Sequence, residues 1–273
     1  MENHSIELEY RGHIAVVTLN RPHKKNAFDE KMWDDFENIT AKLKKNTPRV
    51  VIVTGAGNAF SAGFDVNPEN PQVSRLVEAV QNHQRRPVEA LIGRIRTAVD
   101  NFVFLPVPVI AAINGSAYGG GAELAARCDL RVIDPAAVFC FSETRLGLMP
   151  DWGGGVALSR LIGASRAADL ILTAREIDAR EAASMGMVNR TSPPGKVLEE
   201  AMQLAEQIAG NGPCAVRHAL SVIRKAADLP QGHALQVETD EATSLITSGE
   251  CYHGITAFLN NEKPQFPDPG KKQ

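Results

Sequence analysis

Alternating and compact apolar runs predict a chain that cycles through strand, turn and helix. Residues 6–12 and 13–20 read as two short strands joined at a glycine. Residues 27–45 place apolar side chains at helical spacing, with charges on the opposite face. Residues 48–57 and 107–115 are runs rich in β-branched residues that end in glycine, which is typical of buried strands. The repeated cycle favours an α/β architecture with parallel strands.

Two later segments depart from this cycle. Residues 66–100 start as a polar, proline-containing loop and continue as a charged amphipathic helix broken near Pro87. Beside a glycine-rich turn, such a segment is either a mobile cover over a pocket or a solvated connecting helix, and both readings stay open. The last third carries three helical patterns. We therefore expect an α/β core over residues 1–195 and a helical region over residues 196–273.

Composition and charge narrow the class of protein. With 273 residues, 44% of them hydrophobic and 22% charged, the chain is long and apolar enough for a globular fold, which excludes a disordered or fibrous protein. A net charge of −3 disfavours a general nucleic-acid binder. The amino terminus lacks the pattern of a secretory signal, and no apolar run is long enough for a membrane span. We expect a cytoplasmic protein without a membrane association.

Cysteine and histidine spacing gives no sign of a metal site. The four cysteines are scattered without a C-x-x-C pair, and we expect them to be reduced thiols. The seven histidines show no metal-ligand spacing. Dinucleotide-binding, P-loop and nucleophile-elbow motifs are also missing from the sequence. We therefore expect no metal and no cofactor.

Two glycine-rich turns, residues 113–124 and 146–158, carry the candidate chemistry. The N–H groups at the start of the helix after the first turn would stabilise an anion, including a transient oxyanion. Three carboxylates flank the turns: Glu123, Glu143 and Asp151. Each has a plain structural alternative, since Glu123 and Glu143 could lie on the surface and Asp151 could be a helix N-cap. Together they predict a cavity suited to acid–base catalysis beside an oxyanion hole.

The ordered motifs resemble those of the crotonase superfamily, the enoyl-CoA hydratase/isomerase fold. VTLNRPHKKNAF, VVIVTGAGNAFSAGFDV, PVPVIAAINGSAYGGGAELAARCDLRV, FSETRLGLMPDWGGG and GITAFLNNEKPQF follow in the family's order, from about residue 5 to residue 266. The resemblance implies a spiral of ββα turns followed by a helical C-terminal trimerisation region. It also implies an acyl-CoA substrate and a homotrimer or a hexamer built as a dimer of trimers.

Site residues follow from the same resemblance. It implies an oxyanion hole made by the backbone N–H groups of Phe64 and Gly120. Glu143 would handle the proton at the α-carbon, and Glu123 would position and help to activate the water that adds across a 2,3-trans double bond. The implied substrate and CoA contacts are Lys24, Lys25, Ala62, Asp65 and Val66.

The sequence departs from the hydratase pattern in the second turn. Asp151 and Trp152 stand where hydratases commonly have Gly-Ala, and Asp151 lies eight residues after Glu143, where isomerases and other branches of the superfamily place a working carboxylate. Hydration with Glu123 and Glu143 is the first hypothesis, and isomerisation of an enoyl- or dienoyl-CoA with Glu143 and Asp151 is the second. A non-catalytic or RNA-binding member is a third, which both glutamates and the net charge disfavour.

Overall fold

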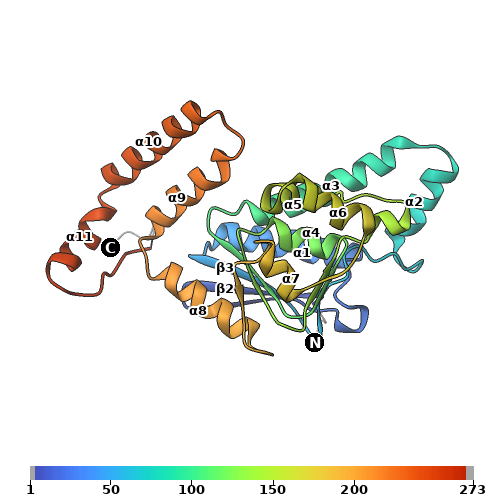
Figure 1. Ribbon diagram of the computed structural model, residues 1–273, viewed down its shortest axis with the longest axis horizontal. Helices are drawn as coiled ribbons and strands as arrows, with labels where there is room; N and C mark the ends of the chain where they lie inside the picture. Colours follow the sequence, from blue (N-terminus) through green and yellow to red (C-terminus); the bar gives the residue numbers. More distant parts are fainter. Residues whose placement is uncertain (1–3, 269–273) are drawn as a thin grey trace.

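A computed structural model describes residues 4–268, and its strands form two sheets near the centre of the molecule (Figure 1). The first sheet has six strands in the order β1-β2-β3-β5-β7-β10. Its neighbours run parallel except for β1, which pairs antiparallel with β2. The strands of this sheet are β1 (Ile6–Arg11), β2 (Ile14–Leu19), β3 (Val50–Gly55), β5 (Val109–Ile113), β7 (Leu130–Ile133) and β10 (Arg190–Thr191). The predicted parallel α/β architecture is confirmed.

The second sheet is short and gives the chain its spiral path. Its order is β4-β6-β8-β9, with β9 antiparallel to β8. Each turn of the spiral places one strand in each sheet and then forms one or more helices, so β3, β5 and β7 are followed by β4, β6 and β8. The strands of this sheet are β4 (Ala59–Ser61), β6 (Ser116–Tyr118), β8 (Val138–Cys140) and β9 (Ile177–Asp178).

Helices cover the sheets, and the first sheet separates two clusters of buried apolar residues. The larger cluster lies between the sheets and helices α1, α3, α4 and α5, and it contains the aromatic residues Phe28, Trp33, Phe36, Phe102 and Trp152. The helices of this part are η1 (Pro22–Lys24), α1 (Glu30–Lys45), α2 (Pro71–Gln81), α3 (Arg85–Val103), α4 (Gly120–Arg127), η2 (Glu143–Leu146), α5 (Gly154–Ile162), α6 (Ala164–Thr173) and α7 (Ala179–Ser184).

The segment 66–100 forms two helices rather than one broken helix. The chain turns at His83, whose φ is 51°, and α3 starts at Arg85 with Pro87 in its first turn. Proline is tolerated there because the first amides of a helix have no intrahelical acceptor. Helices α2 and α3 project at one end of the molecule (Figure 1).

The C-terminal helices divide into one that packs on the core and three that extend from it. Helix α8 (Val197–Ala209) covers the outer face of the first sheet and completes the second apolar cluster. Helices α9 (Pro213–Ala226), α10 (Gln231–Ser248) and α11 (Glu250–Leu259) form an arm that points away from the sheets (Figure 1). The domain division at residue 195 stays a prediction. Within residues 4–268, no helix has the length and apolar character that crossing a bilayer requires.

Candidate active site

One pocket collects most of the predicted site residues. It has a volume of about 190 Å³ and lies where the two glycine-rich turns meet the loop after β4. All three predicted carboxylates and both predicted oxyanion residues line it, together with Ala62 and Val66. The predicted site residues that line this pocket are therefore Ala62, Phe64, Val66, Gly120, Glu123, Glu143 and Asp151.

The start of α4 brings a free amide into this pocket. Gly120 is the first residue of the helix, so its N–H has no intrahelical acceptor. The loop after β4 packs directly against it, because a Cβ added to Gly63 would lie 2.6 Å from the Gly120 nitrogen. Gly63 has a φ of +81°, a conformation that L side chains rarely adopt. Glycine at this position thus allows the loop and the helix start to touch.

The amide of Phe64 points away from the neighbouring strand segment. Residues 28 and 64 form an isolated parallel bridge, in which Phe28 donates to the Gly63 carbonyl and Asp65 donates to the Phe28 carbonyl. Because consecutive amides of an extended chain point to opposite sides, the Phe64 N–H faces away from Phe28. Both predicted oxyanion donors therefore stand beside one pocket with their N–H groups outside the backbone ladder.

A buried network holds this loop in shape. The Ser61 hydroxyl donates to the Asn26 carbonyl at 2.8 Å and accepts the Gly63 amide at 3.1 Å. The Asn26 side chain donates to the carbonyls of Ala56 and Ala59. Ser61 and Asn26 have no exposed surface, so their hydrogen bonds are shielded from water. Sequence reasoning did not single out either residue.

Glu123 is a buried cap rather than a surface carboxylate. It is 1% exposed, and its Oε2 accepts the Gly154 amide at 2.7 Å while its Oε1 accepts the Asp151 amide at 3.2 Å. Gly154 is the first residue of α5, so the Glu123 side chain from α4 satisfies the start of the next helix. The surface alternative for Glu123 is wrong.

Asp151 does not cap α5. The N-cap position belongs to Gly153, and no side chain of the cap residue bonds to the helix. The Glu123 carboxylate accepts the Gly154 amide, which is the amide that the side chain of an N-cap aspartate would otherwise accept. The N-cap alternative for Asp151 is therefore wrong. Asp151 lines the pocket at its exposed edge, and desolvation raises the pKa of its carboxyl. The sequence could not reveal this because the competing cap comes from a residue 28 positions away.

Glu143 is buried without a hydrogen-bond partner. It opens the 3-10 helix η2 after β8, and neither carboxyl oxygen has a partner among residues 4–268. Burial raises the pKa of Glu143, and burial and then the charge of Glu143 raise the pKa of Glu123. Two carboxyls this close share a proton at neutral pH. Glu123 accepts the amides of two other residues, Asp151 and Gly154. The backbone amide that favours the charged form of Glu143 is only its own, so we place the proton on Glu143 and the charge on Glu123.

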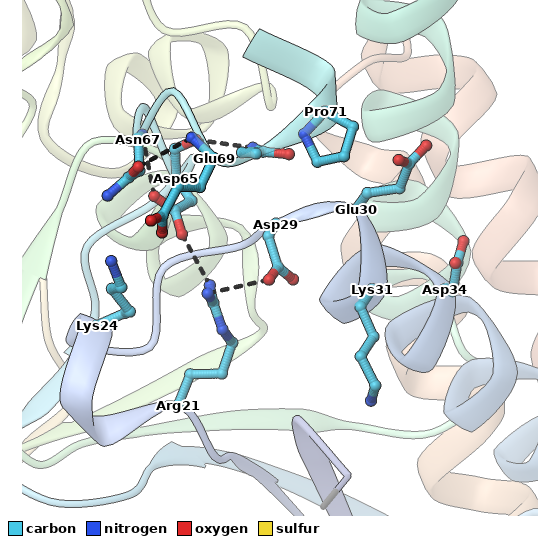
Figure 2. Close-up of a pocket in the computed structure, with 11 residues that line it drawn as sticks. Arg21, Lys24, Asp29, Glu30, Lys31, Asp34, Asp65, Asn67, Glu69 and Pro71 are labelled. Carbon is cyan, nitrogen blue, oxygen red and sulfur yellow. Dashed lines mark hydrogen bonds and ion pairs between the residues drawn. The ribbon is translucent and has the colours of Figure 1, made fainter. Parts of the chain in front are cut away.

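The remaining predicted contacts lie outside this pocket. Lys24 and Asp65 line a separate hollow of about 520 Å³, and Lys25 is exposed and lines neither. Figure 2 shows Arg21 in that hollow between Asp29 and Asp65, with nitrogen–oxygen distances of 3.0 and 3.1 Å. The Asp65 side chain is thus engaged by Arg21.

Several lining residues were missed from the sequence. They are the apolar side chains of α2 and α3, the serine before Glu143 and the residues of the second glycine-rich turn: Leu76, Val88, Leu91, Ile92, Ile95, Ser142, Leu146, Leu148, Met149 and Trp152. The segment 66–100 therefore forms a wall of the pocket. The i, i+3, i+4 and i+7 spacing of Val88, Leu91, Ile92 and Ile95 was the signal for a shared apolar face. Among the described residues no group of three potential metal ligands occurs, and the expected lack of a cofactor stays a prediction.

Comparisons with known proteins agree on one family. A family model for enoyl-CoA hydratase/isomerase matches residues 9–269. A short-chain-enoyl-CoA hydratase of Clostridium acetobutylicum is 32% identical over 270 residues, 96% of this chain and 97% of that protein. An enoyl-CoA hydratase of Mycobacterium tuberculosis is 34% identical over 268 residues, 95% of each chain. The crystal structure of an enoyl-CoA hydratase from Bacillus anthracis has a TM-score of 0.86 and 35% identity, covering 96% of this chain and 98% of that one. The chain therefore belongs to the enoyl-CoA hydratase/isomerase family of the crotonase superfamily, and it is a hydratase or an isomerase.

Proposed function

We propose that this protein is an enoyl-CoA hydratase that adds water across the 2,3-trans double bond of an acyl-CoA thioester. The observation that carries the proposal is the buried carboxyl of Glu143, which lacks a partner and shares a pocket with Glu123 and the free amide of Gly120. Burying a carboxyl without a partner costs stability, and catalysis is the use that explains it. Several relatives are named enoyl-CoA hydratases, which supports the same choice.

The substrate carbonyl would bind between the two backbone donors. The Phe64 and Gly120 N–H groups donate to the thioester oxygen and stabilise the negative charge that develops there during addition. Because both donors are fixed by the backbone, they need no reorganisation at the moment of reaction. The double bond next to this carbonyl then lies between Glu123 and Glu143.

The two glutamates would divide the proton transfers. Ionised Glu123 takes a proton from a water molecule, and the hydroxide oxygen forms a bond to C3. The π electrons move to C2 and into the thioester oxygen as an enolate. Protonated Glu143 then delivers its proton to C2, which restores the carbonyl. Transfer of the water proton from Glu123 to Glu143 returns the pair to its starting state.

The other expectations remain proposals. CoA would contact Lys24, Lys25 and the loop residues Ala62, Asp65 and Val66, and no cofactor would take part. The arm of α9–α11 would assemble the chain into a trimer or a hexamer, supported by the exposed apolar residues of that arm. We also propose a cytoplasmic location.

Isomerisation is the second candidate, and the position of Asp151 favours it. Its carboxyl lines the same pocket as Glu143, has a raised pKa and is not used as a helix cap. An acid and a base on one pocket could move a proton along the acyl chain, with no water added. A non-catalytic role fits the structure least, because it leaves the buried Glu123–Glu143 pair without a purpose.

One assay separates the two reactions. Hydration of crotonyl-CoA removes its conjugated absorbance and yields a 3-hydroxyacyl thioester, whereas isomerisation of a 3,5-dienoyl-CoA yields no alcohol. We expect hydration, and we expect Glu143→Gln and Glu123→Gln each to lose at least about a hundredfold in kcat. Asp151→Asn is the matched variant and should keep most hydration. Isomerisation without hydration, abolished by Asp151→Asn, would select the second candidate.

A further inference from the structure

Trp152 forms the inner wall of the pocket, next to the proposed oxyanion donor. The side chain is 2% exposed and lines the pocket. A Cβ added to Gly120 would overlap the Trp152 indole, so the ring lies against the Gly120 Cα. A substrate whose carbonyl accepts the Gly120 amide therefore has its acyl chain beside this indole.

The indole is held on several sides. Its ring centroid lies 4.7 Å from that of Trp33 and 5.4 Å from that of Phe28, both in edge contacts. The Trp152 carbonyl accepts a hydrogen bond from Arg127 at 2.8 Å. Arg127 is itself paired with Asp100. A side chain fixed by two buried rings and by its own backbone cannot easily swing aside for a larger ligand.

Part of the apolar lining lies toward the open end, whereas Ile95 lines the pocket and is buried like Trp152. Val66, Leu148 and Met149 line the same pocket but are 60–71% exposed. The pocket volume, about 190 Å³, is below the ~300–1,000 Å³ of pockets that enclose a drug-sized ligand. The whole pocket is therefore small, and the indole forms part of its buried wall together with Ile95.

We propose that Trp152 is a specificity-determining residue that restricts the substrate to short-chain acyl thioesters. This inference rests on the proposed function and deepens it, because it names the class of acyl group. A short unsaturated acyl group would fill the buried part of the pocket between Trp152 and the Glu123–Glu143 pair. A long chain would have to displace the indole or run along the exposed rim.

Binding of saturated acyl-CoA esters tests this without relying on catalysis. Titration calorimetry with butyryl-CoA and decanoyl-CoA gives a ratio of the two dissociation constants for each variant. We expect Trp152→Ala to shift this ratio toward decanoyl-CoA by at least about tenfold, since even small changes in apolar pocket volume give discrimination of that size. Leu172→Ala is the matched control, because Leu172 is an exposed apolar residue of α6 outside the pocket, and it should leave the ratio within about twofold of the wild type. Trp152→Phe is the second variant, in case the alanine variant fails to fold, and should shift the ratio in the same direction.

The results of this titration distinguish a failure of the Trp152 inference from a failure of the proposed hydratase function. An unchanged ratio in a folded Trp152 variant would overturn the inference and leave the hydratase proposal intact. A shift of equal size in Leu172→Ala would also overturn it, because the ratio would then not depend on the wall of the pocket. If the wild type binds neither ester, the acyl-CoA function itself fails. Normal butyryl-CoA binding without hydration of crotonyl-CoA would contradict only the reaction proposed above.

Discussion

Glu143 keeps a buried titratable carboxyl in the pocket, and the effect of burial on its pKa outweighs the lowering effects of its own backbone and of Glu123. Its folded-state pKa is raised above the ordinary value of 4.5, so ionisation opposes folding. The contribution of Glu143 to the free energy of unfolding is therefore greatest below the ordinary carboxyl pKa, and it falls as the pH rises toward the raised pKa of the folded state. Glutamine cannot ionise. We therefore expect Glu143→Gln to melt at a higher temperature than the wild type near pH 8, with the difference shrinking near pH 5.

Thermal unfolding across that pH range measures the effect. Glu238→Gln is a suitable control because Glu238 is exposed on α10, so the variant removes the same kind of carboxyl from a position outside the pocket. A melting difference for Glu143→Gln that is constant with pH would mean that the carboxyl is not forced to hold a proton. If Glu143→Gln melts at a lower temperature than the wild type at every pH, ionisation of the buried Glu143 carboxyl does not destabilise the folded protein as we propose.

The Ser61 hydroxyl helps to fix the conformation of the loop after β4. Its hydroxyl is bonded to Asn26 and Gly63, and Gly63 precedes the proposed donor Phe64. Without the hydroxyl the Gly63 amide loses its acceptor, and the direction of the Phe64 amide depends on the bridge to Phe28 alone. We expect Ser61→Ala to lower kcat for crotonyl-CoA by about tenfold to a hundredfold with CoA binding unchanged, because small displacements at reacting groups are costly. Ser184→Ala, an exposed serine on α7, is the control.

The measurement for Ser61 separates positioning from folding. A positioning role lowers kcat and leaves the melting temperature and the dissociation constant of CoA close to the wild type. A structural role would instead raise KM and lower the melting temperature with kcat per folded enzyme preserved. That second pattern would remove Ser61 from the oxyanion argument.

At the scale of elements, the sequence was most informative where local pattern and structure coincide. The β-branched runs became β3 and β5, and the first triple glycine became the start of α4, because propensity and periodicity act over a few residues. Glu123 and Glu143 were correctly placed on one cavity. The cap of α5 was not predictable, since Glu123 reaches it from another helix. Likewise, the apolar face of α3 showed a helix but not that it would line the pocket.

A comparable long-range cap joins the elements of the arm. Glu250 on α11 accepts the amides of Cys214 and Ala215 at 2.8–3.0 Å and is 9% exposed. These are the first free amides of α9, because Pro213 has none. We expect Glu250→Ala to cost about 2 kcal/mol, since it leaves amides at a helix start without an acceptor. Melting temperature and hydrogen exchange in the first turn of α9 are the measurements.

Glu238→Ala on the exposed side of α10 is the control for this variant. It should leave both quantities unchanged, because Glu238 lies at the surface of the arm. If Glu250→Ala melts and exchanges like the wild type, the junction between α9 and α11 is held by packing rather than by this carboxylate.

At the scale of the whole molecule, the arm presents apolar surface that the rest of the chain does not cover. No residue of α10 is buried in the described part of the chain. On α11, Tyr252, Phe258 and Leu259 are 72–80% exposed. Large exposed apolar patches mark association surfaces, and closed symmetric assemblies cover such patches repeatedly. This surface is the physical support for the proposed trimer or hexamer.

The assembly prediction is tested on α11 itself. Introducing charge at the centre of an apolar interface is costly because the charge must be desolvated without a partner. In analytical ultracentrifugation we expect the wild type to sediment as the proposed trimer or hexamer, and the variant with both Phe258→Asp and Leu259→Asp to sediment as a folded monomer. Val80→Asp on α2, a site of similar exposure outside the arm, should leave the mass of the assembly unchanged. A wild type that sediments as a monomer would contradict the proposed assembly. An oligomer that survives both α11 changes would place the interface on another surface.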